Sequence, residues 1–255
     1  MITIHDSTRR LFLGLAIAGA LFASLPLAAA SASPDPAPAS VTQASFIILD
    51  YHTFLGNKDS KIDFPATEFA TQLDRLLAMG FRFVRLEDAV AGRISGRNNL
   101  VLTIDDGNHS VYHMVKEVLV PRKIPAFLFV YPGIVDSRKF ALTTAQIQEL
   151  LTLDCGVGAH GWFHEYMTPK AWAKDPAKVM KEVTRPGPLL KKVTGSQPEH
   201  FAYPFGVGAP EAGQELRVDQ LRGHGPAGTF QHLHVLARSV HHRQSGPVQD
   251  LVERL

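Results

Sequence analysis

Two adjacent carboxylates, Asp105 and Asp106, follow the apolar run "LVLTI" at residues 100–104, and Gly107 comes directly after them. A turn alone would explain the Asp-Gly pair, because this dipeptide is common in tight turns. Neighbouring side chains at a strand end point to different sides, so one carboxylate can bind a metal ion while the other accepts a proton from water. The pair is therefore a candidate for metal and acid/base chemistry.

Imidazoles follow a second apolar run. His160 and His164 lie in "HGWFH", directly after "CGVGA" at residues 155–159. Two histidines at this spacing converge on one ion if the loop between them winds one helical turn. Two imidazoles and one carboxylate suit a borderline divalent ion such as zinc, with a position left open for water. The spacing is not specific by itself, and chance placement at the surface is the competing interpretation.

The elements that would position these side chains alternate between short apolar runs and amphipathic stretches. This alternation indicates parallel strands joined by helical crossovers, so the predicted fold class is α/β. In such folds reactive groups collect at the C-terminal ends of strands. The expected strands are 45–50, 81–86, 100–104, 125–131, 156–159 and 200–204. The expected helices are 65–80, 109–119, 143–151 and one long helix over about 170–194.

Composition narrows the class of protein. The chain has 255 residues, of which 45% are hydrophobic, enough to bury a full core in one domain. Its net charge of +2 gives no indication of a nucleic-acid or membrane-surface partner. The single cysteine, Cys155, excludes an intrachain disulfide framework and a CxxC site, and its apolar neighbours predict a buried thiol.

The N-terminus has the organisation of a targeting signal. Arg9 and Arg10 precede an apolar stretch at residues 11–25, and small residues follow, which predicts a secretory signal peptide over residues 1–32. The twin-arginine and general secretory routes both stay open, and a retained membrane anchor is the alternative. Residues 33–44 are rich in Pro, Ala and Ser and are expected to form a linker. We therefore expect export to the periplasm or the extracellular space, with no stable membrane span after cleavage.

Three short motifs, taken together and in order, resemble those of a known family. "TIDDG" (103–107), "HGWFH" (160–164) and "FAYPFG" (201–206) are similar to the motifs of the polysaccharide deacetylases of carbohydrate esterase family 4, the NodB homology domain. The resemblance covers about residues 45–210. It implies a distorted (β/α)7 barrel that removes N-acetyl groups from amino-sugar polymers with one divalent metal ion, usually zinc.

The resemblance also implies a role for each matching residue. Asp105, the first acid of the pair, would be the general base. Asp106, His160 and His164 would be the metal ligands. Phe205 falls where the family uses a backbone N–H in the oxyanion hole.

Two positions depart from the common family pattern. Ala202 stands where the family often has an arginine that orients the base, and the Leu-x-His motif that supplies the general acid is not convincingly present. "ILDYHTF" near residue 50, however, resembles the first strand of the circularly permuted subgroup that deacetylates poly-β-1,6-N-acetylglucosamine. In that subgroup the acid histidine lies in the first strand, which implies that His52 is the general acid. A structural histidine at a strand end is the alternative.

The end of the chain is harder to interpret. Residues 211–255 lose the periodicity of the preceding chain, with at most one weak strand at 230–236, and form a tail of unknown role. Because the family has seven strands, we hold the hypothesis that the barrel is incomplete at its C-terminus. Three functions follow as alternatives: an exported deacetylase of an amino-sugar polymer, a small-amide amidohydrolase of the same fold, and a non-catalytic carbohydrate-binding protein.

Overall fold

The computed structural model describes residues 44–57, 60, 62–209 and 212, which all belong to one compact unit. The predicted signal peptide at 1–32, the linker at 33–44 and the tail at 211–255 lie outside the described residues, apart from residues 44 and 212. In the part of the chain that the structure describes, no helix has the length and apolar character needed to cross a membrane.

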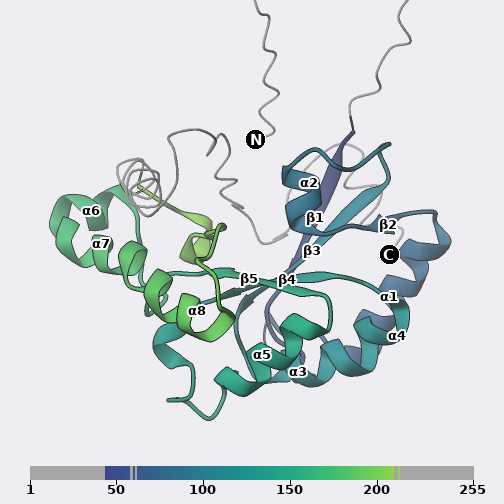
Figure 1. Cartoon of the computed structure of the whole chain (residues 1–255), viewed down its shortest axis with the longest axis horizontal. Helices are drawn as coiled ribbons and strands as arrows, with labels where there is room; N and C mark the ends of the chain where they lie inside the picture. Colours follow the sequence, from purple (N-terminus) through teal and green to yellow (C-terminus); the bar gives the residue numbers. More distant parts are fainter. Residues whose placement is uncertain (1–43, 58–59, 61, 210–211, 213–255) are drawn as a thin grey trace, which may run out of the picture. The chain divides into compact units, whose positions relative to one another are not determined.

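A parallel sheet with β3 at its centre is the frame of the fold (Figure 1). Its strands are β1 (Phe46–Tyr51), β2 (Arg82–Phe83), β3 (Asn99–Asp106), β4 (Ala126–Val130) and β5 (Cys155–Ala159). The order is β1-β3-β4-β5, and β2 pairs with the first two residues of β3. All these pairings are parallel, which confirms the predicted α/β class.

Helices and short helical turns connect the strands. They are α1 (Ala66–Ala78), α2 (Leu86–Val90), α3 (Ser110–Met114), the π-helical η1 (Val115–Leu119), α4 (Val120–Arg122), the 3₁₀ turn η2 (Pro132–Ile134), α5 (Thr144–Thr152), α6 (Pro169–Lys174), α7 (Pro176–Thr184), α8 (Pro186–Thr194) and the 3₁₀ turn η3 (Pro204–Gly206). The α3, η1 and α4 segments follow one another without a break in the chain, so the helix predicted over 109–119 begins one residue later and ends three residues later than predicted.

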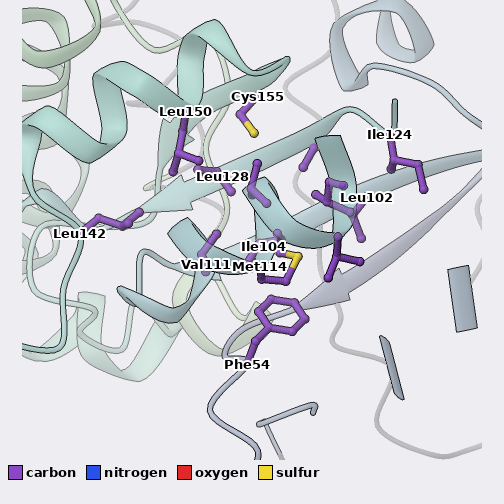
Figure 2. Close-up of a cluster of buried hydrophobic side chains, with 14 of the residues drawn as sticks. Phe54, Leu102, Ile104, Val111, Met114, Ile124, Leu128, Leu142, Leu150 and Cys155 are labelled. Atoms are coloured by element: carbon purple, nitrogen blue, oxygen red, sulfur yellow. The ribbon is translucent and has the colours of Figure 1, made fainter. Parts of the chain in front are cut away.

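The largest core cluster packs one face of β3 and β4 against α1, α3 and α5 (Figure 2). Leu102 and Ile104 of β3 lie in this cluster with Leu128 of β4, as the two-residue period of a strand requires. Cys155 lies there too, 6% exposed, as its apolar neighbours predict. The alternate residues, among them Val101 and Phe129, pack on the other face against α2 and Ala202. Both faces of the central strands are therefore buried. Packing on both sides fixes the orientation of these strands and of the residues at their ends.

Two predicted strands are wrong in extent. The stretch at 81–86 gives only the two-residue β2, because the chain turns into α2 at Leu86. The stretch at 200–204 contributes a single parallel bridge, between Phe201 and Ala159, before Pro204 begins η3. Pro204 has no N–H to donate to a ladder, which explains why the pairing stops.

The long helix predicted over 170–194 is three helices, α6, α7 and α8. Pro176 and Pro186 stand at the first positions of α7 and α8, where a proline ring costs no intrahelical hydrogen bond. Asp175 caps α7 by accepting a hydrogen bond from the backbone N–H of Lys178. Each proline lacks the N–H that would continue the preceding helix, so a new helix begins there.

Candidate active site

The two acids end β3 in a way that strand geometry alone does not give. Asp106 has φ of 73° and Gly107 has φ of 75°, so the chain leaves the extended conformation at the second carboxylate. A Cβ on Gly107 would lie 2.9 Å from Cγ1 of Val130, which explains why a glycine stands there. Strand alternation predicted that the two carboxylates point to different sides. An oxygen of each carboxylate lies 3.6 Å from Nε2 of His160, while only Asp106 belongs to the cluster with His164 and only Asp105 to the cluster with His52.

Hydrogen bonds hold both the backbone and the side chain of His160. Its backbone N–H donates to the carbonyl of Val130, and its ring Nδ1 lies 3.0 Å from the carbonyl oxygen of Ala202. A carbonyl only accepts, so Nδ1 carries the proton and Nε2 presents a lone pair to the two acids. Burial, and then the charge of His164, lowers the pKa of His160 to about 3, so the ring is neutral at neutral pH. A neutral imidazole with a fixed tautomer is the form that binds a metal ion.

His164 reaches the same place by a different backbone path. Residues 160–164 contain no helical turn, so that part of the prediction is wrong. Gly161 has φ of 74° and His164 has φ of 61°, and these two left-handed residues bring the second imidazole back towards the strand ends. Nε2 of His164 lies 3.2 Å from Oδ1 of Asp106.

Asp106, His160 and His164 fit a metal ion. One ligand atom from each lies within 4.8 Å of the others. Among the described residues, Oδ1 of Asp106 is a buried oxygen that accepts no hydrogen bond, an arrangement that is costly without a cation. A carboxylate and two neutral imidazoles form a donor set for zinc and for several other divalent ions.

A second cluster includes Asp105. Asp50 and His52, from the end of β1, lie within 4.8 Å of Asp105, measured between one ligand atom of each. His52, predicted as the general acid, is thus next to the predicted base. Burial raises the pKa of the Asp105 carboxyl well above its usual range, and the charges of Asp50 and Asp106 raise it further.

Sequence reasoning missed Asp50. Its carboxylate accepts a hydrogen bond from the Thr103 hydroxyl at 2.9 Å, between the paired strands β1 and β3. Burial raises the pKa of Asp50 to about 6, against the opposing effect of the charge on His52. Asp50 closes an apolar run two residues before His52, so the rule that strand ends carry the chemistry was sufficient to find it.

Aromatic rings surround the exposed side of His164. The Phe205 ring lies against His164 with centroids 4.5 Å apart, and Tyr166 stacks on Phe205 at 3.9 Å. Tyr131 lies on another side of His164 at 5.2 Å. Phe205 has φ of 60°, so the third motif also contains a left-handed residue beside the site. All six residues predicted for the site thus lie in one place, and their roles stay predictions.

Fold and site together define a parallel α/β protein with a carboxylate and imidazole site at its strand ends. A family model described as polysaccharide deacetylase matches residues 93–222. The solved structure of IcaB from Ammonifex degensii is 33% identical with a TM-score of 0.60, and the match covers 69% of this chain and 82% of that one. The chain therefore belongs to the polysaccharide deacetylase family, which confirms the resemblance of the motifs.

More distant structures share the fold. The deacetylase PplD of Streptococcus pyogenes, solved in complex with acetate, is 19% identical with a TM-score of 0.58, over 67% of this chain and 78% of that one. The BpsB deacetylase domain of Bordetella bronchiseptica is 19% identical with a TM-score of 0.55, over 67% and 85%. The comparison with curated proteins finds no match. The family and its solved relatives support a deacetylase.

Proposed function

We propose that the protein is a metal-dependent hydrolase that removes N-acetyl groups from an amino-sugar polymer, poly-β-1,6-N-acetylglucosamine or a related cell-envelope glycan. The observation that carries the proposal is the division of the site into two parts around the acid pair. Asp106 faces two imidazoles in a metal-type cluster, whereas Asp105 also faces His52 and Asp50. Hydrolysis of an amide needs both parts: electrostatic activation and proton transfer.

Asp106, His160 and His164 would hold one divalent ion, with zinc as the expected metal. A bound ion of this kind supplies Lewis-acid polarisation of a carbonyl and lowers the pKa of water. The Ala202 carbonyl keeps the His160 ring in the tautomer that ligation requires.

Asp105 would accept the proton of the attacking water. Its carboxylate is adjacent to the metal-type cluster, with Oδ2 at 3.6 Å from Nε2 of His160, yet it is not itself a member of that cluster. A base must lie within reach of the water whose proton it takes, and this position beside the metal-type cluster supports that role.

His52 would give a proton to the departing amine. An unprotonated amine is a poor leaving group, so a site with a base and no acid is slow. Asp50 lies beside His52 and Asp105 in the same cluster, so a carboxylate adjoins the proposed acid. The backbone N–H of Phe205 would stabilise the oxyanion that forms on the amide oxygen.

A polymer substrate is supported by the surroundings of His164. Exposed aromatic rings offer flat apolar surface for the faces of sugar rings; they are Phe163, Tyr166 and Phe205, each at least half exposed. The preference for β-1,6 linkages is supported by the resemblance of "ILDYHTF" to the first strand of the circularly permuted subgroup. Export with cleavage of residues 1–32 would bring the protein to such a glycan.

Acetate release from N-acetylglucosamine oligomers tests the proposal. We expect acetate from β-1,6-linked oligomers, less from β-1,4-linked oligomers, and none after exhaustive treatment with a chelator. Activity restored by added zinc would support the metal. Tight oligomer binding without acetate release from any linkage would instead identify a non-catalytic carbohydrate-binding protein, and turnover of small acetamides alone would identify an amidohydrolase.

A further inference from the structure

Glu182 is a buried acid on the core face of α7. It is 3% exposed, and it lies between Val179 and Val183, which are both buried in the cluster that packs α7 against Phe201. A carboxylate at such a position is costly unless its oxygens are hydrogen-bonded. The question is therefore what Glu182 binds.

Its partners are backbone amides of the histidine loop, residues 160–165. Oε2 of Glu182 accepts from the N–H groups of Trp162 at 2.8 Å, Phe163 at 3.0 Å and Glu165 at 3.4 Å. These amides lie between and just after the two imidazoles of the metal-type cluster. One buried oxygen thus collects three backbone donors from the segment that carries two of the three proposed ligands.

The histidine loop has a glycine at the point where it contacts this carboxylate. A Cβ on Gly161 would lie 2.8 Å from Oε2 of Glu182, so a side chain at position 161 would push the acid away. On the other side, the Trp162 carbonyl accepts a hydrogen bond from Gly133 at 3.0 Å. The peptide groups on both sides of Trp162 are thereby held by partners outside the loop.

Such anchoring is what the backbone of the loop requires. His164 has φ of 61°, a backbone conformation that a residue other than glycine keeps only when the surrounding structure imposes it. Among the described residues, the carboxylate of Glu182 is the charged group that accepts hydrogen bonds from these amides. Hydrogen bonds to an ionised acceptor are stronger than neutral ones.

We propose that Glu182 is a positioning residue for the metal site: it fixes the histidine loop so that His160 and His164 converge with Asp106. The inference rests on the proposed function, because it assigns a role towards the metal that the three ligands would hold. Glu182 itself touches neither ligand atoms nor substrate. Its influence is on the geometry and therefore on the affinity of the site.

Glu182→Gln is the informative variant, since glutamine keeps the shape and one acceptor oxygen but removes the charge. Changes at groups that orient metal ligands cost about 10–100-fold in metal affinity, and we expect a weakening of this size for Zn²⁺. Glu165→Gln is the matched control. Its side chain is 46% exposed and pairs with Lys178, so the same loss of charge leaves the three amides bonded.

Two measurements decide the matter. In the metal-free chain, hydrogen exchange should be faster at the amides of Trp162 and Phe163 in Glu182→Gln than in the wild type, with the amides of β3 unchanged. Competition with a chromophoric chelator should then give a Zn²⁺ dissociation constant about 10–100-fold higher for this variant, and an unchanged value for Glu165→Gln.

Two results for Glu182→Gln would overturn the inference: unchanged hydrogen exchange, or faster hydrogen exchange with an unchanged Zn²⁺ dissociation constant. In both cases the wild type would still bind zinc and release acetate. A wild type that binds no zinc would instead overturn the proposed function. If Glu182→Gln does not fold, Glu182→Asp keeps the charge but withdraws the carboxylate from the loop by one methylene. It should weaken Zn²⁺ binding in the same way, and unchanged binding would again count against Glu182.

Discussion

Asp106 and His164 place Oδ1 and Nε2 3.2 Å apart, and both residues have left-handed backbone, with φ of 73° and 61°. This conformation costs a residue with a side chain on the order of 1–2 kcal/mol. Backbone strain persists where surrounding contacts over-determine it, and it concentrates at functional sites. Asp106 and His164 are both strained, and the atoms with which they could bind a metal ion lie next to each other. This arrangement supports a ligand-binding role for this part of the fold.

The first prediction concerns metal content. We expect one tightly bound divalent ion per chain and its loss in the double variant His160→Ala, His164→Ala, because two of the three ligand atoms disappear. Elemental analysis of the purified, dialysed protein measures the stoichiometry. His113→Ala is the control, since that imidazole is 69% exposed on α3, away from the cluster. An unchanged metal content in the double variant would show that the two histidines are not the metal ligands.

The second prediction separates the base from the ligands. Asp105→Asn should lower kcat for acetate release by about 10²–10⁴-fold, the usual contribution of a positioned base. Metal content should stay near that of the wild type, because Asp106 and both imidazoles remain. Steady-state kinetics and elemental analysis on the same preparation check both statements. Loss of the metal in this variant would show that Asp105 is a ligand rather than the base.

The third prediction concerns His52 and the leaving group. His52→Ala should slow the cleavage of an acetamide by about 10²–10⁴-fold, because the amine then departs without a proton donor. An aryl acetate ester should lose much less activity, because a phenolate leaves without protonation. The ratio of the two rates is the measurement. Equal losses on both substrates would contradict the role of acid and favour a structural histidine at the strand end.

The fourth prediction is a test of packing at η2. A Cβ on Gly133 would lie 2.4 Å from the Trp162 carbonyl oxygen and 2.7 Å from the Phe163 ring. Gly133→Ala should therefore lower the free energy of unfolding by about 1–3 kcal/mol, as overpacked sites do. Gly187→Ala in α8 is the control, because its Cβ would meet only the end of the flexible Gln197 side chain. Urea unfolding of both variants gives the comparison, and equal stabilities would contradict the clash.

The fifth prediction concerns Cys155. Burial, and then the charge of Asp154, raises the pKa of its thiol to about 12. The reactive thiolate forms only as the pH rises towards that value, so at pH 8 the native thiol should react with iodoacetamide about a thousandfold more slowly than an exposed thiol of pKa ~8.5. Mass spectrometry of native and urea-unfolded protein measures the two rates. Similar rates in both states would show that the thiol is accessible in the native fold.

The sequence predicted what is set by local pattern. The apolar run before Asp105 defined β3 and its end, and the periodic stretch at 65–80 defined α1, because burial on the sheet imposes those periods. The six site residues followed from the rule that strand ends carry the chemistry, together with the resemblance of three short motifs.

Local pattern could not give the backbone path at the site. Two-residue alternation predicted neither the left-handed conformation of Asp106 nor the approach of both acids to Nε2 of His160. The loop of His164 likewise depends on Glu182, a contact between a helix and a loop that sequence spacing does not encode. A glutamate on an apolar helix face, between Val179 and Val183, was the available indication.

The link between the histidine loop and α7 has a consequence for biosynthesis. A chain made from its N-terminus presents Asp105 and Asp106 well before the imidazoles, and the imidazoles before Glu182 and the Ala202 carbonyl that hold them. In a chain whose synthesis has not yet reached His160, two of the three proposed ligand atoms are absent. The proposed ligands and the groups that hold them are therefore all present only in a chain whose synthesis has passed residue 202.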